Sequence, residues 1–195
     1  QQKNRARQSG KFRAIINKAN WTLIDQGSSN EFMGYSQTRT NSKIRKFRKI
    51  DDCHYEIVLN QTPFYAEQGG QVGDTGTINS ENFSFDVLDT KNDSGDIIHF
   101  GKIKNGDIEL QVDVLATIDT KRRQKIRLNH TATHLLHKAL KIVLGKHVHQ
   151  AGSLVEDKRL RFDFTHSEKL KNEDIFEIEK IVNKIIRKNH LIQTN

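Results

Sequence analysis

The chain has 195 residues, of which 34% are apolar and 29% charged, with one proline and one cysteine. This length suffices for one large domain or for two small ones, each with its own core. No run of eighteen apolar residues occurs and the N-terminus is polar, which excludes a helical membrane span and a secretory signal peptide. A single thiol cannot form an intrachain disulfide, so the sequence indicates a soluble, cytoplasmic protein.

The net charge of +8 is distributed unevenly along the chain. Residues 1–50 contain 12 basic and 2 acidic residues, residues 51–120 contain 3 and 14, and residues 121–195 contain 17 and 8. Two basic flanks therefore surround an acidic middle segment. Basic surfaces attract phosphate groups, which makes a nucleic acid a candidate partner, although an ordinary solvated surface would account for the same charges.

The first part of the chain is predicted to be a basic helix. Helix-forming residues dominate this stretch, and its cations include Arg5, Arg7, Lys11 and Arg13. A turn-rich segment around Gly27 then ends it. We expect residues 1–30 to be a linker helix that enters from an upstream domain.

Residues 31–118 show apolar residues with a period of two, which is typical of strands that bury one face. Two such series are Cys53, Tyr55, Ile57, Leu59 and Val112, Val114, Ala116, Ile118. Glycines between the series supply turns. The pattern predicts a small antiparallel sheet or barrel, with Cys53 packed in its core.

Residues 119–195 return to the helical period. The spacing predicts a helix from Lys121 to Leu144 that ends at Gly145. A strand is expected at Leu160–Phe164, followed by a second helix that Asn172 caps. The predicted fold class is therefore α+β: an N-terminal helix, an antiparallel β-barrel and an incomplete α/β two-layer core.

Two histidines form the sharpest local motif. His130 and His134 lie four residues apart on one helix face, so both could direct a ring nitrogen to one metal ion. Two solvated histidines would show the same spacing. Thr131 stands where helical metalloproteases carry a glutamate, which argues against a protease. The sequence offers poor candidates for the remaining metal ligands, because His137 lies one turn along the helix and His147 belongs to a predicted strand.

The segment Thr62–Gly76 is the second motif, with four glycines among polar residues. Glycine lets the backbone approach a ligand closely and adopt positive φ. The segment lacks the lysine of phosphate-binding loops and no helix follows it. A series of β-turns would have a similar composition.

Together these motifs resemble the alanyl-tRNA synthetases and their freestanding relatives. Thr62–Gly76 is similar to the glycine-rich segment of that family, and Asn129–His137 to its zinc-binding helix. The resemblance continues in order through Gly145–Ser153 and Leu160–His166. Gln1–Arg13 resembles the arginine-rich helix that leads into the editing domain. Threonyl-tRNA synthetases share only the histidine helix.

The resemblance implies an editing domain that hydrolyses tRNA(Ala) wrongly charged with serine or glycine. It implies that His130 and His134 bind zinc, that Gln150 is catalytic and orients water or substrate, and that Thr62 binds the serine hydroxyl. The family's second ligand pair, Cys-x-x-x-His, does not occur after His134.

We therefore expect three parts: the linker helix (residues 1–30), the glycine-rich barrel (31–118) and the first part of a truncated editing core (119–195). The chain alone is expected to be inactive. Its parent would be an alanine-tRNA ligase, whose ATP-binding aminoacylation domain is absent from this sequence. Two alternatives remain: a freestanding trans-editing alanyl-tRNA deacylase, against which the basic lead-in helix argues, and a non-catalytic RNA-binding barrel.

Overall fold

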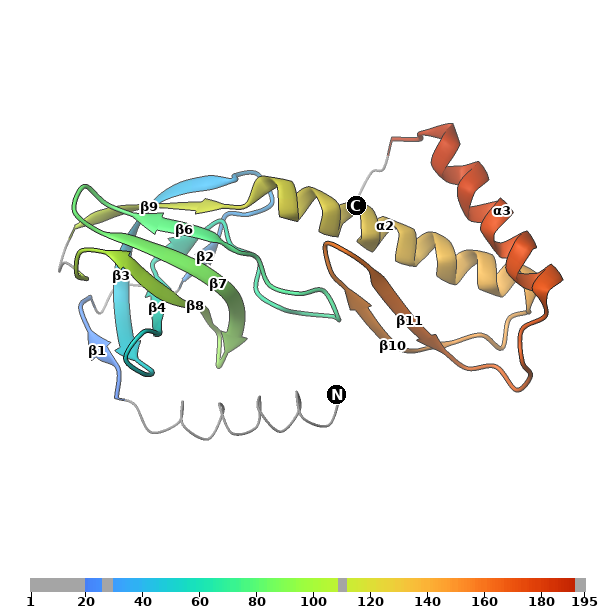
Figure 1. Cartoon of the computed structure of the whole chain (residues 1–195), viewed down its shortest axis with the longest axis horizontal. Helices are drawn as coiled ribbons and strands as arrows, with labels where there is room; N and C mark the ends of the chain where they lie inside the picture. The colour runs from blue at the N-terminus through green and yellow to red at the C-terminus, as the bar shows by residue number, and fades with distance from the viewer. Residues whose placement is uncertain (1–19, 26–29, 109–111, 192–195) are drawn as a thin grey trace. The chain divides into compact units, whose positions relative to one another are not determined.

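The computed structural model describes residues 20–25, 30–108 and 112–191 (Figure 1). Of the predicted linker helix (residues 1–30), residues 1–19 and 26–29 lie outside the described residues. The chain divides into two compact units, one drawn from Gln1–Gln68 and Gly73–Thr120 and the other from Gly69–Val72 and Lys121–Asn195. The fold class is α+β, as predicted. Neither helix in the described part of the chain has the length and hydropathy needed to cross a membrane.

The described residues of the first unit form a closed antiparallel barrel of six strands, which confirms the predicted barrel. Around the barrel the order is β3 (Arg39–Lys49), β4 (Tyr55–Leu59), β8 (Asp96–Asn105), β7 (Ser84–Asp93), β6 (Gly76–Asn79) and β9 (Asp113–Ile118). Pairing of β9 with β3 closes the sheet on itself. Closure removes the exposed edges that an open sheet would present.

Three short strands flank the barrel. The strand β1 (Thr22–Leu23) pairs with β3, and β2 (Glu31–Phe32) runs parallel to β5 (Gln61–Thr62). The β2–β5 pair fixes the start of the glycine-rich segment, because Met33 N also donates to Thr62 O at 2.8 Å.

The barrel core is built from the inward residues of the period-two series. The fully buried members include Ile57, Leu59, Ile78, Phe85 and Ala116. Burial of each large aliphatic or aromatic side chain contributes about 1.5–3 kcal/mol. The prediction for Cys53 is wrong, since this residue is exposed in the turn before β4. The Asp51 carboxylate accepts the N–H of Cys53 at 2.9 Å and thereby holds the turn.

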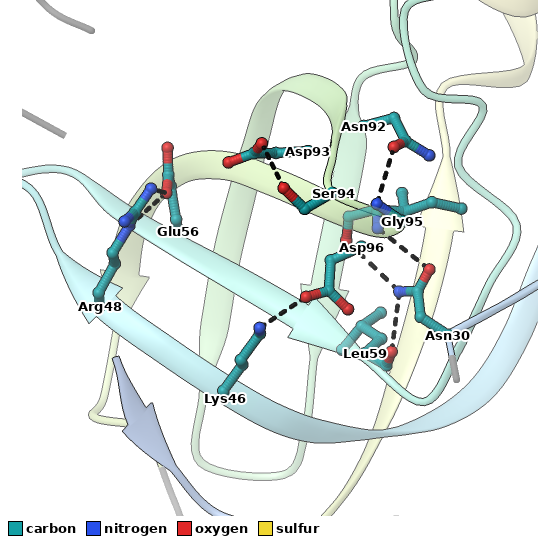
Figure 2. Close-up of polar contacts among 11 residues, drawn as sticks. Asn30, Lys46, Arg48, Glu56, Leu59, Asn92, Asp93, Ser94, Gly95 and Asp96 are labelled. Carbon is teal, nitrogen blue, oxygen red and sulfur yellow. Dashed lines mark hydrogen bonds and ion pairs between the residues drawn. The ribbon is translucent and has the colours of Figure 1, made fainter. Parts of the chain in front are cut away.

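A polar network braces one side of the barrel (Figure 2). Arg48 and Glu56 form an ion pair at 2.6 Å, with both side chains only 7% exposed. Lys46 pairs with Asp96 at 2.6 Å. Trp21 receives both cations, with Lys46 Nζ 4.7 Å and Arg48 Cζ 4.4 Å from its ring centroid. The network therefore anchors Trp21, just before β1, to β3.

The second unit contains two helices and a hairpin among its described residues. They are α2 (Thr120–Val143), β10 (Gln150–Val155), β11 (Leu160–Phe164) and α3 (Asn172–Lys188). The two strands pair antiparallel. Its core joins α2, β11 and α3 through Ala139, Leu140, Phe162, Phe164 and Ile178. The two predicted helices and the strand at Leu160–Phe164 are observed, but β10 precedes that strand and was not part of the predicted helix–strand–helix order. The predicted cap is wrong, since Asn172 is the first residue of α3 and Lys171 occupies the cap position.

Candidate functional site

The glycine-rich segment contributes four residues, Gly69–Val72, to the second unit. Gly69–Val72 runs beside β10: Val155 N donates to Gly70 O at 2.8 Å, and Val72 N donates to Val155 O at 3.1 Å. Gln71 is aligned with Val155 in a parallel bridge. These backbone bonds form an isolated parallel bridge and hold the segment against β10.

Gly70 is required at its position for two reasons. Its φ of +86° lies in the left-handed region, and an added Cβ would lie 2.4 Å from Ser153 Oγ and 2.5 Å from Ser153 O. The Ser153 hydroxyl also donates to Gly69 O at 3.4 Å. Close contact of two backbones therefore explains one of the four glycines in this segment.

His130 and His134 lie together on α2. Their rings stack with centroids 5.1 Å apart and planes 23° apart. His130 Nδ1 lies 2.6 Å from Gln71 Oε1. Desolvation lowers the pKa of His130, and the neighbouring His134 lowers it further. The His130 imidazole is therefore held neutral, which is the form that can bind a metal ion.

A small cavity of about 70 Å³ joins these residues to the hairpin. His130, His134 and Gln150 all line it, so the structure brings three of the four predicted site residues together. Gln150 Nε2 donates to Ser153 Oγ at 3.3 Å, which orients the amide.

His137 also lines the cavity, although the sequence spacing argued against it as a further ligand. Its ring lies 5.0 Å from that of Phe162. Burial lowers the pKa of His137 and so favours its neutral form. Its Nε2 atom is buried with no hydrogen-bond partner among the described residues. A buried polar atom without a partner is unusual, and here it is on a residue that lines the cavity.

Thr62, the fourth predicted site residue, belongs to the first unit and is not one of the described residues that line the cavity. Its side chain is fully buried, with Oγ1 2.8 Å from His99 Nε2. Phe64 N donates to the same oxygen at 3.2 Å. The hydroxyl is thus already engaged as a donor and as an acceptor.

Sequence reasoning missed His99 because it lies within an apolar strand. Its Nδ1 lies 2.9 Å from Ile57 O, so this nitrogen carries the hydrogen and Nε2 accepts from Thr62. Burial lowers the pKa of His99 to about 4. The sequence signal that could have identified His99 is a histidine at an inward position of a period-two series.

The donor chemistry of His130 and His134 fits zinc, since neutral imidazoles are common zinc ligands. Within the residues that the structure describes, however, no group of three or more His, Cys, Asp or Glu is placed to hold a metal ion. The pair therefore fits half of a four-ligand site and not a complete one.

A comparison with known protein families identifies the family of the first unit. The family model described as tRNA synthetases class II (A) matches residues 1–122, which is more than half of the chain. The match includes the barrel and ends near the start of α2. His130, His134 and Gln150 lie beyond the matched residues.

Proposed function

The chain belongs to the class II tRNA synthetase (A) family, that of the alanyl-tRNA synthetases, and on this premise we propose that its second unit forms part of an editing site for mischarged tRNA. The family is one of ligases in protein biosynthesis and implies tRNA as the partner. The substrate of the proposed site is tRNA(Ala) charged with serine or glycine. The single observation that supports it is the grouping of His130, His134 and Gln150 around one cavity.

The need for a second site follows from the chemistry of discrimination. A synthetic pocket of apolar character rejects an added hydroxyl only by about a hundredfold. A separate hydrolytic site that holds the wrong amino acid removes the errors that remain. Because the cavity is about 70 Å³, it has room for a few water molecules or for a small polar group.

We assign His130 and His134 as two of the ligands of a zinc ion. When bound, zinc would lower the pKa of a coordinated water or polarise the ester carbonyl. The chain's own residues do the remaining work. Gln150 can donate to an ester oxygen and accept from a water through the same amide. Ser153 accepts from Gln150 and so keeps the amide at the cavity.

The role of Thr62 as the residue that binds the serine hydroxyl stays a prediction. Its hydroxyl would have to exchange a bond with His99 or Phe64 for a bond to the substrate. A Thr62→Ser variant keeps the hydroxyl and a Thr62→Val variant removes it at constant shape. Loss of seryl-tRNA hydrolysis in Thr62→Val alone would support the assignment.

The proposal is tested in a full-length synthetase that carries this segment. Gln150→Ala and His134→Ala should each slow the deacylation of pre-formed seryl-tRNA(Ala), by about 10²–10³-fold if they contact the reacting ester. Aminoacylation with alanine should remain at the parental rate, because that reaction uses a different domain. His134→Ala should also lower the zinc content, whereas Gln150→Ala should not.

His166→Ala is the matched control, since this exposed histidine belongs to the same unit but does not line the cavity. It should leave both reactions unchanged. If Gln150→Ala and His134→Ala still clear seryl-tRNA at the parental rate, the editing assignment is wrong, and a non-catalytic RNA-binding role becomes the better description.

A further inference from the structure

Gln71 is a buried polar side chain whose backbone is fixed by contacts on both sides. Only 8% of the residue is exposed. Its backbone is aligned with Val155, and its neighbours Gly70 and Val72 are both hydrogen-bonded to that residue. The backbone position of Gln71 is therefore fixed. From there its amide oxygen lies 2.6 Å from His130 Nδ1.

This contact determines where the hydrogen of the His130 ring lies. An amide oxygen can only accept a hydrogen bond, so Nδ1 must carry the hydrogen. In a neutral imidazole the other nitrogen, Nε2, then keeps its lone pair. If the amide nitrogen faced the ring instead, the hydrogen would lie on Nε2 and that atom could not act as a ligand or as an acceptor.

We propose that Gln71 is a positioning residue that holds His130 in the tautomer with hydrogen on Nδ1, leaving the lone pair of Nε2 available at the cavity. This role deepens the proposed function, on which its relevance to zinc rests. The tautomer itself does not depend on a metal ion. Histidines that bind metals commonly donate their second ring nitrogen to an acceptor in this way.

The proposal also gives a physical reason for the conformation of the glycine-rich segment. Gln71 can reach His130 only if Gly69–Val72 lies against β10, and Gly70 permits that approach because a Cβ would strike Ser153. A segment 59 residues from His130 in sequence thus controls the chemistry of its ring.

The decisive measurement is nitrogen-15 NMR of histidine-labelled, metal-free protein at a pH where His130 is neutral. Long-range proton–nitrogen correlations distinguish the two tautomers. The chain as it stands should show hydrogen on His130 Nδ1. Hydrogen on Nε2 would overturn the proposal without any substitution being needed.

Two variants extend the test. Gln71→Glu retains an oxygen that can only accept and should keep the same tautomer, whereas Gln71→Met has similar length and no comparable acceptor and should lose it. Gln68→Met is the matched control, because Gln68 is exposed and belongs to the first unit. An unchanged His130 tautomer in a folded Gln71→Met variant would also overturn the proposal.

Zinc affinity provides the second readout, measured by titration of a full-length synthetase that carries the segment. Gln71→Met should weaken zinc binding by about 10–100-fold, and Gln71→Glu should preserve it. If the tautomer responds as expected but removal of both His130 and His134 leaves zinc binding intact, the proposed zinc assignment fails while the role of Gln71 stands. If zinc binding needs both histidines but His130 carries its hydrogen on Nε2, the role of Gln71 fails while the zinc assignment stands.

Discussion

Thr62 and His99 form a fully buried pair, with Thr62 Oγ1 2.8 Å from His99 Nε2. The ring is satisfied on both sides, because Nδ1 donates to Ile57 O. It also packs edge-on against Phe64, with centroids 5.1 Å apart. The pair joins β5 to β8 and β4. Protonation of Nε2 would break its hydrogen bond from the Thr62 hydroxyl.

This pair predicts a specific dependence of barrel stability on pH. The pKa of His99 is about 4 in the folded state and 6.5 in the unfolded state, so between these values the unfolded chain binds more protons. Stability is therefore fully present above pH 6.5 and is lost as the pH falls towards 4, by about 1.4 kcal/mol per pH unit. Urea unfolding at several pH values measures the effect.

His99→Gln is the reference for this experiment, since it removes the titration and retains hydrogen-bonding capacity. Other groups titrate equally in both proteins and cancel in the difference. The stability advantage of the parent should shrink by up to about 3 kcal/mol on acidification to pH 4. A constant difference between the two proteins would contradict the assignment of this pH dependence to His99.

A pair of adjacent glycines gives the second prediction. Gly69 and Gly70 both have positive φ, at +61° and +86°, but no described atom lies within 4 Å of a Cβ built on Gly69. Gly69→Ala should therefore cost only backbone strain, about 1–2 kcal/mol. Gly70→Ala adds a clash with Ser153, which typically costs a further 1–3 kcal/mol or so. Equal losses in urea unfolding would show that the clash is relieved by movement elsewhere.

The third prediction concerns metal content. Because only His130 and His134 are assigned among four expected ligands, this chain alone should bind zinc weakly. After dialysis against a chelator, elemental analysis should find much less than one zinc per chain. Stoichiometric zinc that resists the chelator would show that the ligands have been misassigned.

The fourth prediction is that tRNA binding by the chain weakens steeply with salt. The cations that we expect to contribute are Arg5, Arg7 and Arg13, which lie outside the described residues, and Lys121, Arg122 and Arg123 at the start of α2. Titration at several salt concentrations gives the slope. Loss of one phosphate contact in Lys121→Ala should reduce the slope by about 0.7–0.9.

Lys102→Ala in the acidic segment serves as the comparison and should leave the slope unchanged. An affinity that did not vary with salt would remove the electrostatic explanation. Arg122 already faces Asp157 at 3.7 Å, so its substitution should have a smaller effect than that of Lys121.

The spacing of apolar residues predicted most strands and helices well, because buried positions recur every second residue in a strand and every three to four residues in a helix. Ile57 and Leu59 marked β4, and α2 was expected within one residue of its observed ends. Cys53 matched the same period and was still misplaced, because the side chain of Asp51 turns the backbone just before β4. One local hydrogen bond can therefore override a periodic match.

The candidate site could be predicted only in part for a different reason. His130 and His134 are neighbours on one helix, so their spacing was sufficient to place them together. The contact of His130 with Gln71 joins residues far apart in sequence, and the spacing of residues in a single sequence does not predict such contacts. The alternation that placed His147 in a strand was also misleading, since β10 begins only at Gln150.

The assignment of Gly69–Val72 to the second unit has a consequence for how such a protein can be recombined. A gene cut at residue 120 would deliver α2 and the hairpin without the segment bridged to β10 and without the acceptor for His130. An exchange of the barrel for an unrelated one would remove the same four residues. The second unit is therefore assembled from two separate stretches of the chain, and a transferable version of it must include both.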